Sequence, residues 1–195
     1  MPSIIDQVRK IVINECQKSR YTISPFPAYS FHIQVVEKYS ILLAKKLKAN
    51  LEITQLGALL HDIGMIKHGK NNHELTGVSE AQKILNNLNY PKNKINRVSE
   101  IIRSHRGSKD IPPETLEAKI VANADAMAHY DILPALMEVA LRENHNDGVK
   151  SYWWLYDKIE RNWQKKLTIP YAREMMKEKY QAIKTVLDSM REYVK

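Results

Sequence analysis

The sequence is poor in cysteine, glycine and proline: its 195 residues include one cysteine, Cys16, with six glycines and eight prolines. A single cysteine excludes an internal disulfide and a cysteine-rich zinc module, and it favours a reducing compartment. So little glycine and proline excludes collagen-like and low-complexity chains. No apolar run approaches the roughly 18 residues that span a bilayer, and the N-terminal segment lacks the pattern of a signal peptide. We therefore expect a cytoplasmic protein with no membrane partner.

The amino-acid composition is that of a globular domain, with 44% apolar and 27% charged residues. The length suits one domain with a substantial core. The formal net charge is +8 and the pI is near 9.4, but the basic residues are spread along the chain without a long block. Binding to nucleic acid is therefore not favoured. A diffuse positive field attracts small anions such as nucleotides and phosphate esters, or it belongs to a solvated surface with no specific partner.

Hydrophobic residues recur with helical spacing along nearly the whole chain. The pattern predicts a helix over residues 31–48, a short apolar helix over 51–61 that Gly64 terminates, and further helices over about 78–88, 95–102, 116–124 and 151–164. Proline suits a first helical turn, so Pro112-Pro113 is predicted to open the helix that contains residues 116–124. Two further helices are predicted to open at Pro134, after a cap at Asp131, and at Pro170. There is no strand pattern, repeat or linker in the sequence. It predicts an all-α fold, a single-domain helical bundle over residues 1–195.

Several histidines and aspartates fall at positions that these patterns predict to be buried. His32 precedes the apolar residues of its helix by three, four and seven positions, and His105 follows those of another helix by the same intervals. Asp125 lies among small residues, His61-Asp62 closes the short apolar helix, and His73 lies in the loop before the next one. One buried histidine is usually a hydrogen-bonded core residue. Four elements that each present an imidazole or a carboxylate indicate a metal site with nitrogen and oxygen ligands, suited to Fe, Mn, Co, Ni, Zn or Mg.

The order of these residues resembles the HD-domain superfamily of metal-dependent phosphohydrolases, and in particular its small stand-alone members. The matching residues are His32, His61-Asp62 within HDIG, His73 within HELTG, His105, and Asp125 within NADAMAH. The resemblance covers about residues 25–130 and leaves about 131–195 as a C-terminal helical extension. It implies an all-helical bundle in which His32, His61, Asp62 and Asp125 bind one divalent metal ion. Members with two further histidines generally have a two-metal centre, which implies one or two ions here, with Asp62 bridging to a second ion bound by His73 and His105.

The same resemblance implies a phosphohydrolase that cleaves a phosphoester or phosphoanhydride of a nucleotide or a related small phosphorylated molecule through a metal-activated water. His61 and Asp62 are then the predicted catalytic residues. The chain departs from the cyclic-di-GMP phosphodiesterases of the HD-GYP type, because it has His105-Arg106 where they have paired histidines. Two alternatives remain open: a di-iron oxygenase on the same scaffold, and a non-catalytic metal-binding module.

Basic residues accompany the predicted ligands along the chain. Arg106, Lys67 and Lys70 are predicted to bind a substrate phosphate, and Arg103 and Lys109 belong to the same basic group. The alternative for each is a solvated rim. His129 follows Asp125 by four residues and is either an orienter of that carboxylate or, as we expect, a surface histidine. Trp153, Trp154 and Trp163 are predicted to pack against the core and not to stack on a base.

Overall fold

The computed structural model describes residues 2–21, 26–106 and 111–194. Within these ranges the chain is helical and has no strand, which confirms the all-α prediction. In chain order the elements are α1 (Ile4–Lys18), the π-helical turn η1 (Tyr29–Ile33), α2 (Gln34–Leu47), α3 (Leu51–Leu60), α4 (Ile63–His68), α5 (His73–Asn87), α6 (Lys92–Ser104), α7 (Leu116–Asp131), α8 (Leu133–Glu143), α9 (Gly148–Arg161), the π-helical turn η2 (Asn162–Lys166) and α10 (Pro170–Ser189). None of the described helices is long and apolar enough to cross a membrane.

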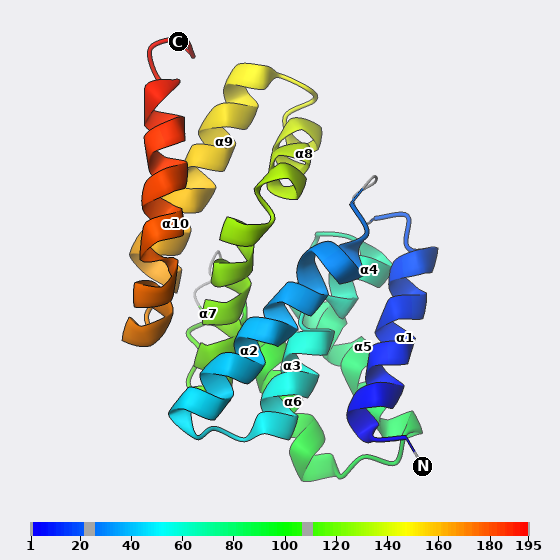
Figure 1. Ribbon diagram of the computed structural model, residues 1–195. Helices are drawn as coiled ribbons and strands as arrows, with labels where there is room; N and C mark the ends of the chain where they lie inside the picture. Colours follow the sequence, from blue (N-terminus) through cyan, green and yellow to red (C-terminus); the bar gives the residue numbers. More distant parts are fainter. Residues whose placement is uncertain (1, 22–25, 107–110, 195) are drawn as a thin grey trace.

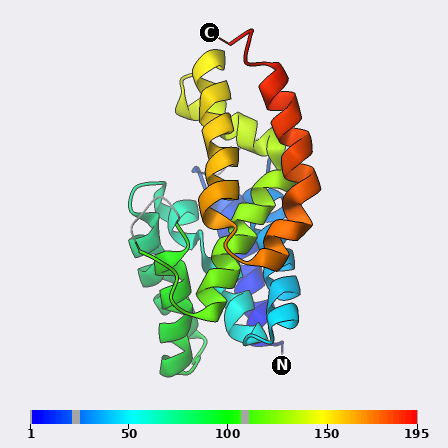
Figure 2. The same cartoon turned by 90° about the vertical axis from the view of Figure 1, so that its left-hand side faces the viewer.

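Helix α7 connects the two halves of the molecule. Helices α1 to α6 gather around one end of it, whereas α8, α9 and α10 extend toward the opposite end, where the C-terminus lies (Figure 1). The second view shows α9 and α10 side by side above the body of the molecule (Figure 2). Helix α7 contacts α2, α3 and α6 on one side and α10 and η2 on the other. Side chains of α7 can therefore meet residues from both halves.

The sequence of α7 explains how one helix can be covered on every side. From Ile120 to Tyr130 all of its residues are buried, and alanines make up much of this stretch. Alanine has the highest helix propensity and lets neighbouring backbones approach closely. A helix that is buried all round has no solvent face, so the polar side chains within it, Asn123, Asp125 and His129, lie inside the protein. Each of them must find a polar partner there.

Helix starts follow capping chemistry more closely than proline positions. The side chains of Asn50, Thr115 and Asp147 accept hydrogen bonds from backbone N–H groups three residues on and so begin α3, α7 and α9. Thr115 and not Pro112-Pro113 therefore opens α7. The predicted cap at Asp131 is wrong, because Asp131 ends α7 and accepts hydrogen bonds from Tyr39 and Lys179. Pro170 opens α10 as predicted, and Pro134 lies in the first turn of α8.

Side-chain contacts attach the C-terminal helices to one another and to α7. The hydroxyl of Tyr152 on α9 donates to the carbonyl of Leu187 on α10 at 2.7 Å, and the rings of Trp163 and Tyr180 stack with centroids 4.2 Å apart. Asn123 of α7 accepts a hydrogen bond from the backbone N–H of Ile169 at 3.0 Å. Trp163 therefore packs, as predicted. These contacts hold α9 and η2 against the part of α7 that carries Asp125.

Candidate metal centre

Five parts of the fold bring the six predicted ligands into one cluster. They are His32 in η1, His61 and Asp62 between α3 and α4, His73 at the start of α5, His105 at the end of α6, and Asp125 in α7. His73 was expected in a loop but is the first residue of a helix. Most of these side chains are buried, and His61 is fully buried. Ligand atoms of His32, His61 and Asp62 lie within 4.8 Å of one another, and so do those of Asp62, His73 and His105.

Asp62 lies between two pairs of imidazoles. Its Oδ2 is 3.4 Å from Nε2 of both His32 and His61. Its Oδ1 is 3.4 Å from Nε2 of both His73 and His105. Each carboxylate oxygen thus faces one pair of histidines, so this single side chain links two adjacent sets of ligand atoms.

Backbone carbonyls face the Nδ1 atoms of three ligand histidines and so determine which ring nitrogen carries the proton. Nδ1 of His61 lies 2.7 Å from the carbonyl oxygen of Ala58, and Nδ1 of His105 lies 2.6 Å from that of Ile102; His73 makes the same contact with Lys70 at 3.0 Å. A ring nitrogen facing a carbonyl is the protonated one, so in the neutral rings the lone pair is on Nε2.

These lone pairs face each other inside the cluster. Nε2 of His32 and His61 are 3.1 Å apart, and Nε2 of His73 and His105 are 3.3 Å apart. Two nitrogen lone pairs at this distance repel unless a cation or a proton lies close to both of them. In addition, Nδ1 of His32 is buried without a hydrogen-bond partner among the described residues. The donor set and its arrangement therefore fit a divalent metal ion bound by imidazole nitrogen and carboxylate oxygen.

The electrostatics of the cluster favour positive charge at its centre. Burial alone would lower the pKa of His61, but the charges of Asp62 and Asp125 outweigh burial and raise that pKa to about 9. Burial would raise the pKa of Asp62, yet His61 and the hydrogen bonds of the surrounding histidines hold it well below its usual value. The carboxylates are therefore ionised, and they attract to His61 a proton that a metal ion has to displace.

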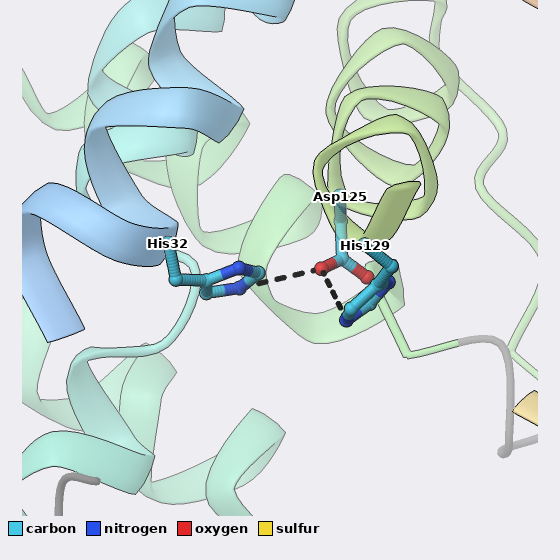
Figure 3. A group of neighbouring side chains, drawn as sticks. All are labelled: His32, Asp125 and His129. Carbon is cyan, nitrogen blue, oxygen red and sulfur yellow. Dashed lines mark ion pairs between the residues drawn. The ribbon is translucent and has the colours of Figure 1, made fainter. Parts of the chain in front are cut away.

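The second carboxylate, Asp125, lies between His32 and a lysine from η2. Its Oδ1 is 3.4 Å from Nε2 of His32, and its Oδ2 accepts a hydrogen bond from Nζ of Lys166 at 2.6 Å. Figure 3 shows the carboxylate of Asp125 directed toward both His32 and His129. Although burial opposes ionisation, the charge of Lys166 keeps the pKa of Asp125 well below its usual value. Lys166 thus holds one oxygen of Asp125 and leaves the other free to face the histidines.

His129 is buried, so the expectation of a surface histidine is wrong. Its Nε2 is 3.9 Å from Oδ1 of Asp125, and its Nδ1 is 3.1 Å from the amide nitrogen of Asn162. With the Asn162 amide in this orientation, Nδ1 accepts a hydrogen bond and the proton of the neutral ring is on Nε2. Burial, and then the charge of Lys158, hold the pKa of His129 well below its usual value. His129 therefore lies beside Asp125 without a hydrogen bond to it, and His32, Asp125 and His129 form a further group of side chains whose ligand atoms lie within 4.8 Å of one another.

Gly64 does not terminate a helix, as the sequence suggested, but lies within α4. A side chain at this position would place its Cβ 2.2 Å from the carbonyl oxygen of His73 and 2.5 Å from the backbone nitrogen of Gly77. The absence of a side chain lets α4 and α5 pack with their backbones in contact. This close approach sets the position of His73, the first residue of α5, relative to Asp62.

The cluster opens into a cavity of about 390 Å³. Its floor contains Asp62, His73, His105 and Asp125, and its walls come from η1, α8, α9 and η2. Lys70 and Arg106 line it, and both already have acidic partners. Lys70 pairs with Glu143, and Nη1 of Arg106 donates to Glu74 at 2.8 Å. Their binding of a phosphate remains a prediction. Lys109 lies outside the described residues, and Arg103 is exposed on α6.

Lys67, the third predicted phosphate ligand, does not belong to the cavity lining. Its ammonium group donates to Glu80 of α5, which also pairs with Lys83 and lies near His68. Glu80 is 6% exposed, and the two lysines overcome the effect of burial and lower its pKa to about 2. The arrangement of Lys67 is that of a structural ion pair between α4 and α5.

The lowered pKa of Glu80 predicts an acid-sensitive contribution to stability. A folded-state pKa of about 2 against an ordinary value of 4.5 means that the contribution is present above about pH 4.5 and is lost as the pH falls toward about 2. Allowing for solvent screening of the exposed lysines, we expect about 2 kcal/mol. Urea unfolding of Glu80→Gln and of wild type should therefore give free energies that differ near neutrality and converge only as the pH approaches about 2. A constant difference across this range would contradict the assignment.

Several cavity residues follow residue 130 and were not singled out from the sequence. Lys158 and Arg161 of α9, and Lys166 of η2, line the cavity. Trp154 lines it as well, so the expectation that this tryptophan only packs is incomplete. The spacing of Trp154, Lys158 and Arg161 by four and three residues would have placed them on one face of a helix. Nothing in the sequence indicates which way that face turns.

Comparison with known proteins agrees with this arrangement. The family model described as the HD domain matches residues 29–129, more than half of the chain. Among solved structures, the chain resembles YpgQ of Bacillus subtilis in complex with ADP, with 20% identity, coverage of 96% of this chain and 94% of that one, and a TM-score of 0.71. It also resembles the Lin1889 protein of Listeria innocua, with 18% identity, coverage of 97% and 96%, and a TM-score of 0.69. A predicted HD superfamily hydrolase from an uncultured Thermotogales bacterium has 22% identity, coverage of 94% and 92%, and a TM-score of 0.57.

Two curated relatives are named tRNA (cytidine(56)-2'-O)-methyltransferase. The one from Picrophilus torridus is 30% identical over 145 residues, which is 66% of this chain and 40% of the relative. The one from Thermoplasma volcanium is 28% identical over 122 residues, 55% of this chain and 34% of the relative. The chain thus spans well under half the length of these relatives.

Proposed function

Because the chain belongs to the HD domain family, we propose that it is a metal-dependent phosphohydrolase that cleaves a phosphoester or phosphoanhydride of a nucleotide or a related small molecule. The observation that carries this proposal is the position of Asp62, whose two carboxylate oxygens each face a pair of histidine nitrogens at 3.4 Å at the floor of a cavity. Phosphoryl transfer by two-metal sites needs such a pair of adjacent ligand sets.

The residues divide into two ligand sets that share Asp62. His32, His61, Asp62 and Asp125 would hold one ion, and Asp62, His73 and His105 would hold a second. A bound divalent ion supplies Lewis acidity toward a phosphoryl oxygen and makes a nearby water more acidic. The chain's own contribution is to fix the ligands. Backbone carbonyls hold the rings of His61, His73 and His105, and Lys166 holds Asp125.

Features of the cavity support a nucleotide as the substrate. Cavities of roughly 300–1,000 Å³ accommodate small organic ligands, and this one falls within that range. It has cationic residues near the ligand cluster and apolar residues, among them Phe31 and Leu136, on other walls. A solved protein of the same fold, YpgQ of Bacillus subtilis, was crystallised with ADP. A phosphate at the cationic end and a nucleoside at the apolar end would suit both surfaces.

Metal analysis and a substrate screen test the proposal together. We expect the purified protein to contain one or two divalent ions per chain. Thermal unfolding of the chelated protein should shift upward on addition of Mn²⁺, Fe²⁺ or Zn²⁺, because an ion that binds only the folded state stabilises it. A panel of nucleotides and phosphate esters should then reveal metal-dependent release of phosphate or pyrophosphate. Absence of metal binding would overturn the proposal. Oxygen consumption by the iron-loaded protein, without hydrolysis of any phosphoester, would favour the di-iron oxygenase that the same ligand set allows.

A further inference from the structure

The cavity has a cationic wall that does not belong to the metal centre. Lys158 and Arg161 of α9 line it, beyond the residues that match the HD domain. Trp154, Lys158 and Arg161 are separated by four and three residues, so they form one face of α9, and all three line the cavity. The same face thus presents two positive charges and an aromatic ring to the space above the cluster.

Within the described part of the chain, the charge of Lys158 is not compensated by an ion pair. Lys166, its neighbour in the cavity wall, donates to Asp125 at 2.6 Å. In contrast, no described residue forms an ion pair or hydrogen bond with the ammonium group of Lys158. Burial, followed by the charge of Lys166, lowers the pKa of Lys158 to about 8, although the charge of Asp125 acts in the opposite direction. A lysine that loses water without gaining a partner costs stability, which a bound anion would recover.

The cavity that Lys158 lines also has apolar residues in its walls. Ile132 and Leu136 of the α7–α8 region line the same cavity and are buried, and Trp154 lies one helical turn before Lys158. An anion bound here would therefore belong to a molecule that also has an apolar or flat part. Inorganic phosphate alone would leave these walls without a partner.

We infer that Lys158, assisted by Arg161, binds a second phosphate group of the substrate while a first phosphate lies at the metal centre. The inference rests on the proposed function and narrows it. The substrate class becomes a nucleoside diphosphate or triphosphate, in which at least two phosphate groups are joined, and a nucleoside monophosphate lacks the group that Lys158 binds. The C-terminal helices then select the substrate, and the residues of the HD domain carry the chemistry.

Two ligands that differ by one phosphate test the inference through binding and not through turnover. The probes are AMP and the non-hydrolysable α,β-methylene analogue of ADP, with affinities measured by calorimetry on the metal-loaded and the metal-free protein. For wild type we expect the diphosphate analogue to bind about ten- to a hundredfold more tightly than AMP. In Lys158→Met this difference should largely disappear, because the coupling between the second phosphate and Lys158 is lost.

A matched control separates this local effect from a general loss of positive charge. Lys150 lies on the same helix, is exposed and pairs with Asp147. Lys150→Met removes one charge as well, and we expect it to leave both affinities unchanged. Thermal unfolding should show Lys158→Met to be at least as stable as wild type, since a partly buried and unpaired charge has been removed. If it fails to fold, Lys158→Gln replaces it in the same comparison.

The affinities of the three proteins for the two ligands decide whether Lys158 binds a second phosphate. A gap between the two ligands that closes in Lys158→Met and persists in Lys150→Met supports the second phosphate site. Equal affinity of wild type for both ligands, or equal weakening of both in Lys158→Met, overturns it. Either of these results leaves the proposed function intact if the wild-type protein hydrolyses a phosphoester, because hydrolysis is measured separately.

Discussion

Asp62→Asn is expected to abolish metal binding and to lower the hydrolysis of the best phosphoester by at least about 10³-fold. The asparagine side chain has the same shape but no charge, and Asp62 is the side chain that approaches all four histidines His32, His61, His73 and His105 at 3.4 Å. Its loss therefore affects both ligand sets at once, whereas each histidine belongs to one set. Elemental analysis and a steady-state assay on the same preparation measure the two effects.

A surface aspartate provides the control for this experiment. Asp157 is exposed on α9, so Asp157→Asn changes the net charge by the same amount without touching the cluster. We expect wild-type metal content and activity for this variant. Circular dichroism of chelated Asp62→Asn should show a folded helical protein, since the helices pack through apolar contacts and not through the cluster. If Asp62→Asn retains both metal ions and its turnover, Asp62 does not link the two ligand sets.

Gly64→Ala is expected to destabilise the protein by about 3 kcal/mol or more and to reduce its metal content. The new Cβ would lie 2.2 Å from the carbonyl oxygen of His73 and 2.5 Å from the nitrogen of Gly77. Both atoms belong to the backbone, so no side-chain rotation relieves the overlap, and α5 has to move away from α4. For a domain of this size the melting temperature should fall by roughly 10 °C. Because His73 moves with α5, the affinity of its ligand set for metal should fall as well.

Gly148→Ala is the matched control for this substitution. Gly148 is the first residue of α9, and a Cβ added there would meet no atom within 4 Å. Replacing this glycine reduces the freedom of the unfolded chain, so we expect unchanged stability or a gain of up to about 1 kcal/mol. Similar stability of Gly64→Ala and Gly148→Ala would show that α4 and α5 do not pack through their backbones.

Helical periodicity was sufficient to predict the all-α fold and the inward direction of some of the clustered residues, because the side-chain positions within a helix follow from its geometry. His32 and His105 were placed from the apolar residues that precede or follow them, and both lie in the cluster. The rotation of α9 about its axis was not predictable, because Trp154, Lys158 and Arg161 belong to a helix with other apolar residues that pack elsewhere. Gly64 was misassigned for a related reason. A glycine needed for close packing between helices has no local signature that distinguishes it from a glycine at a turn.

The π-helical turn η1 has a consequence for how this segment tolerates change. The backbone N–H of Gln34 donates to the carbonyl of Tyr29, five residues earlier, and η1 continues directly into α2. Since an α-helix turns by about 100° per residue, the additional residue in this turn shifts the helical phase of the residues after it relative to those before it. His32 lies within this turn and belongs to the cluster, while Val36, Tyr39 and Leu43 of α2 are buried in the core. Substitution of an exposed side chain in η1 leaves this helical phase unchanged. In contrast, insertion or deletion of one residue changes the angle between His32 and the buried face of α2. The number of residues in this segment is therefore under a stricter constraint than their type.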